Sequence, residues 1–171
     1  MWKLLYNKDL GIFNYLLSFI NLGPYGFLQS TTMVLPSIMA MTIWLGLGSR
    51  MILFLAGLQS IPNEFYEAAD VDGASGFRKF WHITLPLLAP TTFFVLITSV
   101  IFSFQVFGPV YVLTQGGPNG ASDVAVHRIY FEAWQNLRFG YASAETVVLF
   151  AILFVVTIVQ FRYFGRNVSY G

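Results

Sequence analysis

The sequence predicts an all-α membrane protein with about three transmembrane helices. Of its 171 residues, 56% are hydrophobic and only 10% are charged, and the mean hydropathy is +0.65. Soluble domains carry about 25% charged residues, so this chain has too few charges to solvate a globular surface. The segments 10–49, 80–122 and 146–161 contain no Asp, Glu, Lys or Arg. Because one helical crossing needs about 20 mainly apolar residues, each segment can hold one transmembrane helix.

The composition also excludes several functional classes. The chain has no cysteine, which rules out disulfide scaffolds, zinc–thiolate sites and thiol catalysis. Its net charge of +1 gives no basis for binding a nucleic acid. The length fits a single domain that covers residues 1–171.

The N-terminal third is expected to contain a short helix and the first span. Residues 10–22 predict an interfacial helix, and the glycines and proline at 23–26 predict a turn. The first span covers residues 33–47, and a longer version of it continues through Arg50 to residue 58.

Arg50 is the most costly residue of this segment, because a charge inside a bilayer is strongly disfavoured. We interpret Gly46 and Gly48 as a helix break that leaves Arg50 near the lipid headgroups, where its long side chain can snorkel. The alternative interpretation of Arg50 is a cation that lines a path for an anionic solute.

The connection at 60–86 predicts a helix–turn–helix at the membrane surface. Ser60 and Pro62 fit the start of its first helix, and two acids follow in the first turn, where the helix dipole favours them. Gly73 can adopt the left-handed conformation that ends this helix, and Pro86 begins the next span. The second short helix combines apolar and hydrated side chains, namely Phe77, Phe80, Trp81 and Ile83 with Arg78 and Lys79.

Two interpretations of this connection are open. Ala68 and Ala69 are small and follow Glu67, so together they form a compact surface on which a protein partner can close, with Glu67 facing a basic group. The alternative is an amphipathic connector that lies at the level of the lipid headgroups.

The second and third spans cover residues 87–107 and 147–164. Three polar residues near the end of the second span are candidates for lining a solute path: Ser99, Ser103 and Gln105. They fall near one helix stripe, and polar side chains in membranes tend to face a bundle interior or a water-filled cavity. The alternative is hydrogen bonding between helices, which small polar residues often provide.

The segment between these two spans predicts a turn and a helix. The glycine-rich stretch 115–120 lacks the lysine and the preceding strand of a phosphate-binding loop, so we interpret it as a turn. Asp123 and His127 have an i, i+4 spacing that metals can use, but a third ligand is poorly placed. We therefore interpret Asp123, His127 and Glu132 as a hydrated polar face, and we predict no metal, no cofactor and no catalytic residues.

The charges leave the orientation open. If the connection 60–86 and the C-terminus lie inside, four Lys and Arg residues lie on each side, so the positive-inside rule does not decide. In this orientation the N-terminus lies outside, and the simplest explanation is that preceding membrane helices are missing from the chain.

The same connection resembles a known family. The spacing of seven residues matches the EAA motif of bacterial ABC-importer permeases: Glu67, Ala68, Ala69, Gly73, Ile83, Leu85 and Pro86. Four flanking stretches resemble the carbohydrate-uptake branch, including glycerol-3-phosphate and related sugar permeases: 55–62, 112–118, 140–144 and 159–163. The resemblance extends from Gly11 to Tyr170.

The resemblance implies a permease subunit without enzymatic activity of its own. Such a subunit lies in the bacterial inner membrane, pairs with a second permease subunit, contacts a dimer of cytoplasmic ATPases and receives solute from an extracytoplasmic binding protein. The loop 60–86 is then the cytoplasmic coupling element, and Gly116, Gly117 and Pro118 are candidates for contact with the binding protein. Because the family domain has six helices, the chain resembles its C-terminal half, an incomplete copy.

Two alternatives remain to the carbohydrate permease. One is a structural or interaction membrane protein whose amphipathic segment anchors it at the surface, and the other is an ABC permease for peptides or amino acids. The sequence Leu-Thr-Gln-Gly-Gly-Pro at 113–118 favours carbohydrate. Many relatives carry Asp after the phenylalanine that ends the penultimate span, whereas Gly108 follows Phe107 here, so solute contacts are not transferred to that position.

Overall fold

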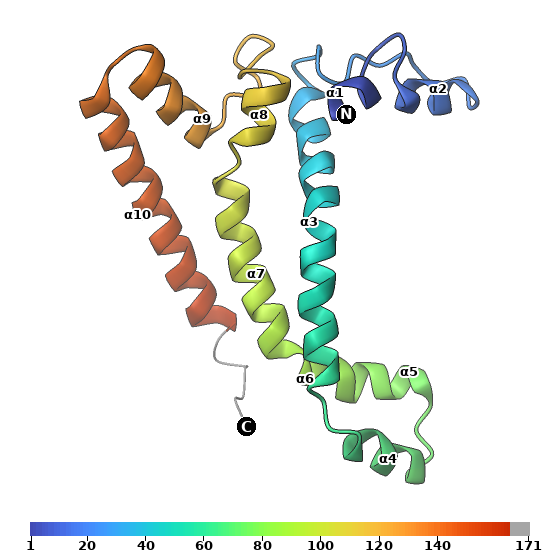
Figure 1. Cartoon of the computed structure of the whole chain (residues 1–171). Coiled ribbons are helices and arrows are strands. Elements are labelled where there is room, and N and C mark those ends of the chain that lie inside the picture. Colours follow the sequence, from blue (N-terminus) through green and yellow to red (C-terminus); the bar gives the residue numbers. More distant parts are fainter. Residues whose placement is uncertain (165–171) are drawn as a thin grey trace. The chain divides into compact units, whose positions relative to one another are not determined.

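The computed structural model describes residues 1–164, and this part of the chain is helical, without strands (Figure 1). The elements in order are α1 (Trp2–Leu5), α2 (Ile12–Ser18), α3 (Val34–Gln59), α4 (Glu64–Val71), α5 (Gly76–Lys79), the π-helix η1 (Phe80–Thr84), α6 (Leu85–Leu87), α7 (Ala89–Phe104), α8 (Gly108–Leu113), α9 (Ala125–Tyr130), the π-helix η2 (Phe131–Gln135) and α10 (Phe139–Phe164). The last part of the family resemblance, residues 165–170, lies outside the described residues.

Within residues 1–164, three segments are long and apolar enough to cross a membrane, as the charge-free windows predicted. They are Val34–Gln59, Ala89–Leu113 and Phe139–Tyr163. In their most apolar windows, between 6% and 17% of the residues are buried within the chain. Most of their apolar side chains therefore point outward, as expected for helices that contact lipid or further membrane helices.

The spans differ in detail from the sequence-based boundaries. The predicted helix break at Gly46 and Gly48 is wrong, because α3 continues without interruption to Gln59. Glycine is tolerated inside transmembrane helices, where no water competes for the backbone hydrogen bonds. The second span is interrupted instead, since residues 105–107 leave the helix between α7 and α8. The third helix begins at Phe139, eight residues before the predicted start.

The chain forms two compact units, which we describe separately. The first consists of Met1–Leu45 and Ser103–Ala151. Its apolar centre is formed by Val34 and Ile38 of α3 with Val110 of α8, all of which are almost fully buried. Four partly buried residues pack against them: Val106, Leu113, Ala121 and Val124. The short helix α8 is thereby anchored to the first turns of α3.

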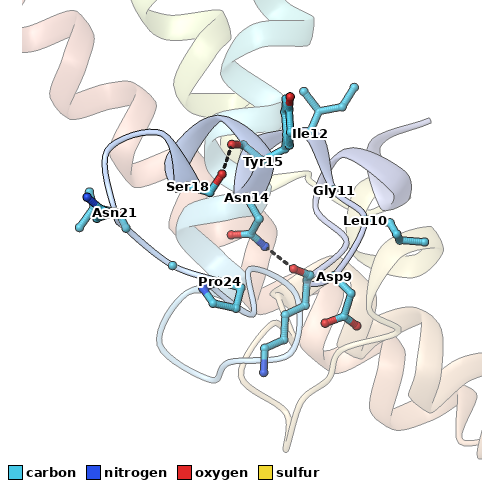
Figure 2. A pocket seen from close by; sticks show the side chains of 12 residues that line it. Asp9, Leu10, Gly11, Ile12, Asn14, Tyr15, Ser18, Asn21 and Pro24 are labelled. Carbon is cyan, nitrogen blue, oxygen red and sulfur yellow. Dashed lines mark hydrogen bonds between the residues drawn. The ribbon is translucent and has the colours of Figure 1, made fainter.

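The N-terminal segment of this unit is also ordered by polar contacts. The Tyr6 hydroxyl donates a hydrogen bond to the Ser37 carbonyl oxygen of α3 at 2.7 Å, and burial raises the pKa of Tyr6. The buried Asn14 side chain of α2 donates to the carbonyl oxygens of Lys8 and Tyr25, each at 2.9 Å. Figure 2 shows Asn14 in the pocket lined by this segment. The interfacial helix predicted at 10–22 is confirmed in the shorter form Ile12–Ser18.

The second unit consists of Gly46–Phe102 and the described chain from residue 152 onward. Gly57 allows α3 and α7 to approach closely, because a Cβ at this position would lie 2.5 Å from the Thr91 hydroxyl oxygen. The rings of Phe93 and Phe161 meet edge to face, with centroids 5.1 Å apart. This unit carries the connection 60–86.

Candidate functional site

The connection 60–86 begins with α4, whose start differs from the prediction. Asn63 occupies the N-cap position, and its side chain makes no capping hydrogen bond. The predicted cap, Ser60, instead donates from its hydroxyl to the Gly57 carbonyl oxygen at 2.7 Å, so it ends α3 and does not start α4. The acids Glu64 and Glu67 lie in the first turn of α4, where the helix dipole favours them.

Gly73 ends α4 as predicted. Its φ is +67°, in the left-handed region that glycine adopts without a steric penalty. The Gly73 amide donates to the Asp70 carbonyl oxygen at 3.0 Å, and the Ala74 amide donates to the Ala69 carbonyl oxygen at 2.9 Å. These two bonds form a Schellman motif, which satisfies the last carbonyl groups of α4.

The second half of the connection folds back onto α4 through polar contacts. The Ser75 hydroxyl oxygen caps α5 by accepting from the Arg78 amide. Lys79 forms an ion pair with Asp70, and the hydroxyls of Tyr66 and Thr84 are hydrogen-bonded at 3.0 Å. Both contacts connect α4 to the segment formed by α5 and η1, so the connection has a defined structure of its own.

The motif residues occupy different positions in this loop. Glu67 and Ala68 are exposed on α4, whereas Ala69 is half-buried. A Cβ at Gly73 would meet no atom within 4 Å. The remaining three motif residues lie in η1 and α6: Ile83 is half-buried, and Leu85 and Pro86 are exposed.

Apolar side chains of the loop also point outward. Val71 at the end of α4 is 89% exposed, and Phe77 of α5 is 76% exposed. An isolated loop in water gains nothing from exposing such side chains, and contiguous exposed apolar surface marks a protein or membrane interface. The outer face of α4 thus combines acids, a small alanine and an apolar residue.

Of the three solute-path candidates, two lie one turn apart on α7, and the third lies outside this helix. Ser99 lies on α7 and its hydroxyl accepts a hydrogen bond from Arg50 Nε at 2.9 Å. Ser103 is exposed four residues later on the same helix, and Gln105 lies in the interruption after α7. The contact between Arg50 and Ser99 was not predicted from the sequence, where the available signal was that Arg50 is the single charge between Asp9 and Glu64.

The glycine-rich segment 115–120 is a turn, as predicted. Positive φ angles occur at Gln115, Gly116, Asn119 and Gly120. The buried Ser122 hydroxyl donates to the Gly117 carbonyl oxygen at 2.6 Å and holds the turn closed. Gly116 is buried against His127, and Gly117 and Pro118 are partly exposed, so any partner would contact mainly the latter two.

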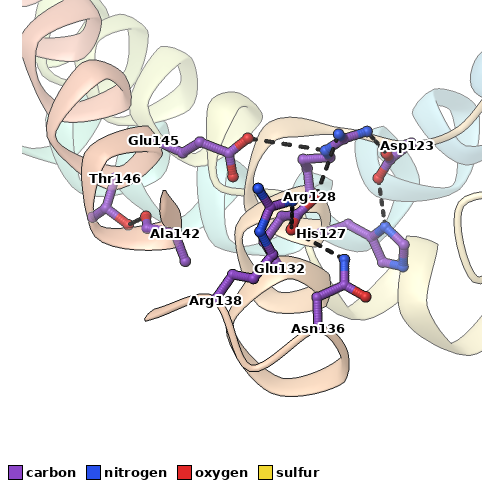
Figure 3. A network of polar contacts seen from close by, with 9 residues as sticks. All are labelled: Asp123, His127, Arg128, Glu132, Asn136, Arg138, Ala142, Glu145 and Thr146. Carbon is purple, nitrogen blue, oxygen red and sulfur yellow. Dashed lines mark hydrogen bonds and ion pairs between the residues drawn. The ribbon is translucent and has the colours of Figure 1, made fainter. Parts of the chain in front are cut away.

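The hydrated polar face predicted for Asp123, His127 and Glu132 is wrong for two of them, because His127 of α9 and Glu132 of η2 are only 5% and 4% exposed, whereas Asp123 is exposed. The error has a physical cause: Arg128 of α9 and Arg138 after η2 supply positive charge beside these carboxylates (Figure 3). Arg128 lies 3.4 Å from Glu132, 3.6 Å from Asp123 and 3.9 Å from Glu145 of α10. Further partners of the Glu132 carboxylate are Arg138 at 3.5 Å and the Asn136 amide at 3.0 Å. Within residues 1–164 no cluster of three side chains is placed to hold a metal ion.

Residues 10–170 match the family described as "Binding-protein-dependent transport system inner membrane component". The chain belongs to this family. Members of the inner membrane component family that resemble it include the sn-glycerol-3-phosphate transport system permease protein UgpA of Agrobacterium fabrum, which is 36% identical over 172 residues, covering 100% of this chain and 58% of the relative. The trehalose/maltose transport system permease protein MalF of Thermococcus litoralis is 37% identical over 161 residues, covering 94% and 54%.

A solved structure supports the same family. In the crystal structure of a bacterial ABC transporter involved in the import of the acidic polysaccharide alginate, one chain is similar with a TM-score of 0.82 and 26% identity, over 98% of this chain and 59% of that chain. The chain therefore spans about three fifths of the length of the relatives it matches.

Proposed function

We propose that the chain acts as the membrane-spanning permease component of an ABC importer, which moves a sugar or sugar-like solute inward by alternating access. The observation that carries this proposal is the loop 60–86. It projects between two candidate spans, has its own hydrogen bonds and presents an exposed acidic and apolar helix, α4. The relatives named for glycerol-3-phosphate and trehalose/maltose transport, and the alginate importer, support a carbohydrate-type solute.

The proposal assigns ATP hydrolysis to a partner. A dimer of cytoplasmic ATPases would bind α4, with Glu67 facing a basic group and Ala68 allowing close approach. A second permease subunit would complete the path through the membrane, and an extracytoplasmic binding protein would deliver the solute on the side of Gly117 and Pro118. The bilayer is the fourth partner, and residues 1–171 would form part of one permease domain.

The contacts within the loop support a role in transmitting force. The Tyr66–Thr84 hydrogen bond and the Asp70–Lys79 ion pair join α4 to the helices that continue into α7. The loop also follows α3 directly, through the buried Ile61. A displacement of α4 by a closing ATPase dimer would thus reach both α3 and α7 through covalent and hydrogen-bonded connections.

The test compares two charge reversals on α4. The permease is expressed with its proposed partners, an ATPase, a second permease and a binding protein, and capture of the ATPase and solute-stimulated ATP hydrolysis are both measured. Glu67→Lys is expected to weaken both by at least about tenfold, which corresponds to about 1.4 kcal/mol. Glu64→Lys, an exposed acid one turn earlier, is the matched control and is expected to have a smaller effect. Normal capture and normal ATP hydrolysis by Glu67→Lys would show that α4 is not the coupling helix.

A further inference from the structure

Arg50 is a charged residue in the interior of a candidate span. It lies on α3 (Val34–Gln59), nine residues before the end, or about 14 Å at 1.5 Å per residue. Charged side chains in transmembrane helices are costly, and where they occur they commonly mark the path of a substrate or an ion. Arg50 therefore needs an explanation beyond helix packing.

The Arg50 side chain follows the ordinary direction of helical side chains, back toward the preceding turn. Its guanidinium lies over Gly46, because a Cβ at Gly46 would be 1.7 Å from Arg50 Nη1. Gly46 is at the middle of α3, about 18 Å from Val34 and about 20 Å from Gln59. A snorkelling side chain would extend toward Gln59, the nearer end. The Arg50 side chain instead points toward the helix centre.

The neighbours of Arg50 do not neutralise its charge. Its Nε donates to the Ser99 hydroxyl of α7 at 2.9 Å. Among the described residues, no carboxylate lies within ion-pair distance of the guanidinium. A guanidinium carries five N–H donors in a planar fork, which matches the two oxygens of a phosphate or carboxylate group. One edge of the fork is thus positioned by Ser99, and the charge has no anion within the described chain.

Gly46 leaves the space in which the Arg50 guanidinium lies. Any larger residue there would displace the guanidinium, although glycine lowers the stability of a helix by about 1 kcal/mol relative to alanine. Gly48, two residues later, meets nothing within 4 Å and serves no such purpose. Residues of both α3 and α7 therefore position the Arg50 side chain.

We infer that Arg50, positioned by Ser99 and Gly46, recognises an anionic oxygen group of the solute, so that the transported sugar-like compound carries a phosphate or a carboxylate. This inference rests on the proposed permease function and deepens it by naming the substrate class. The Arg50 fork supplies charge and two parallel hydrogen bonds, while Ser99 fixes its orientation.

The experiment uses the complete transporter in proteoliposomes with four solutes. Sn-glycerol 3-phosphate tests a phosphate, an alginate oligosaccharide tests carboxylates, and trehalose and maltose are neutral controls. Uptake and solute-stimulated ATP hydrolysis are measured for the unaltered protein and for Arg50→Gln, Arg50→Lys, Gly46→Ala and Gly48→Ala. Capture of the ATPase is measured in parallel, because it tests the proposed function without depending on the solute.

At least one of the two anionic solutes is expected to be transported, and the responding solute distinguishes a phosphate from a carboxylate. Arg50→Gln should raise its half-saturating concentration about 10- to 100-fold, since hydrogen bonds to charged groups are strong. Arg50→Lys should raise the half-saturating concentration less, because lysine keeps the charge but not the planar fork of donors. Gly46→Ala should also weaken the response, while Gly48→Ala should not.

Several results would overturn the inference. Transport of neutral sugars alone, or of none of the four solutes, contradicts an anionic substrate even when the ATPase is captured normally. An unchanged response of Arg50→Gln to the anionic solute contradicts the role of Arg50. Loss of assembly in Arg50→Gln would indicate that the charge pairs with an acid of another subunit and that its role is structural.

Discussion

Gly73 allows the structure of loop 60–86 to be tested separately from its use by a partner. With a φ of +67°, an L-residue at this position costs about 1–2 kcal/mol. Gly73→Ala should therefore increase the open population of the Schellman motif about 5- to 30-fold. No other loss is expected within this chain, because a Cβ at Gly73 meets no atom within 4 Å.

Two further variants separate backbone strain from bulk. Gly76→Ala is the matched control, because Gly76 lies in α5 of the same loop, its φ is not positive, and a Cβ there also meets open space. Gly73→Asn adds a larger side chain but tolerates the left-handed conformation better than alanine does. Asparagine should thus preserve the motif while filling the space beside it.

Two measurements report separately on the structure of loop 60–86 and on its use by a partner. Hydrogen exchange of the Gly73 and Ala74 amides, which donate to α4, should accelerate about 5- to 30-fold in Gly73→Ala and stay nearly normal in Gly76→Ala. Solute-stimulated ATP hydrolysis should fall in both Gly73 variants if a partner closes on this space. Normal exchange in Gly73→Ala would refute the strain argument, and full activity of Gly73→Asn would refute close docking at Gly73.

Three other predictions concern stability in detergent, measured by thermal or chemical unfolding. Gly57→Ala should destabilise the contact between α3 and α7 by about 1–3 kcal/mol, because the new methyl group overlaps a hydroxyl of α7. Gly48→Ala should have no such effect. Equal unfolding midpoints for the two variants would contradict the close approach of the helices. Tyr6→Phe should cost about 1 kcal/mol near neutral pH. Because burial raises the pKa of Tyr6, the folded state holds its proton longer, so stability should fall as pH rises above about 10 and Tyr6→Phe should reduce this fall. Arg128→Met should lower the free energy of unfolding by about 1–2 kcal/mol. The loss should exceed that of Arg138→Met, because Arg128 contacts three carboxylates and Arg138 contacts one. The reverse order would contradict the assignment of Arg128 as the central cation.

The spans and the loop 60–86 could be predicted because their signals are local. A transmembrane helix must exclude charge over its whole length, so the empty segment 146–161 identified the third helix without knowledge of its neighbours. The left-handed cap at Gly73 was likewise predictable, since the acids and alanines before it favour a helix and glycine adopts a positive φ freely.

The failures depend on how side chains a few residues apart are oriented and buried in the folded chain. Glu132 looked hydrated on its own helix, but Arg138 after η2 and Arg128 before it neutralise the carboxylate and allow it to be buried. Gly46 looked like a helix break, but in α3 it makes room for a side chain one turn later. The i, i+4 spacing of Arg128 with Glu132 and of Gly46 with Arg50 shows that these residues can meet on a helix, but their burial and side-chain direction are decided only when the chain has folded.

The two unusual charges of this chain therefore differ in what they indicate. Glu132 is buried, but two arginines and an amide surround its carboxylate, so its burial is explained by structure alone. Arg50 is placed in the middle of a span, and the partner that the described chain gives it is a neutral hydroxyl. A fold that neutralises one costly charge with three partners has the means to neutralise another. Within residues 1–164 no carboxylate lies within ion-pair distance of Arg50, so the inferred contact with an anionic group of the solute and a contact with an acid of another subunit make opposite predictions for assembly of Arg50→Gln.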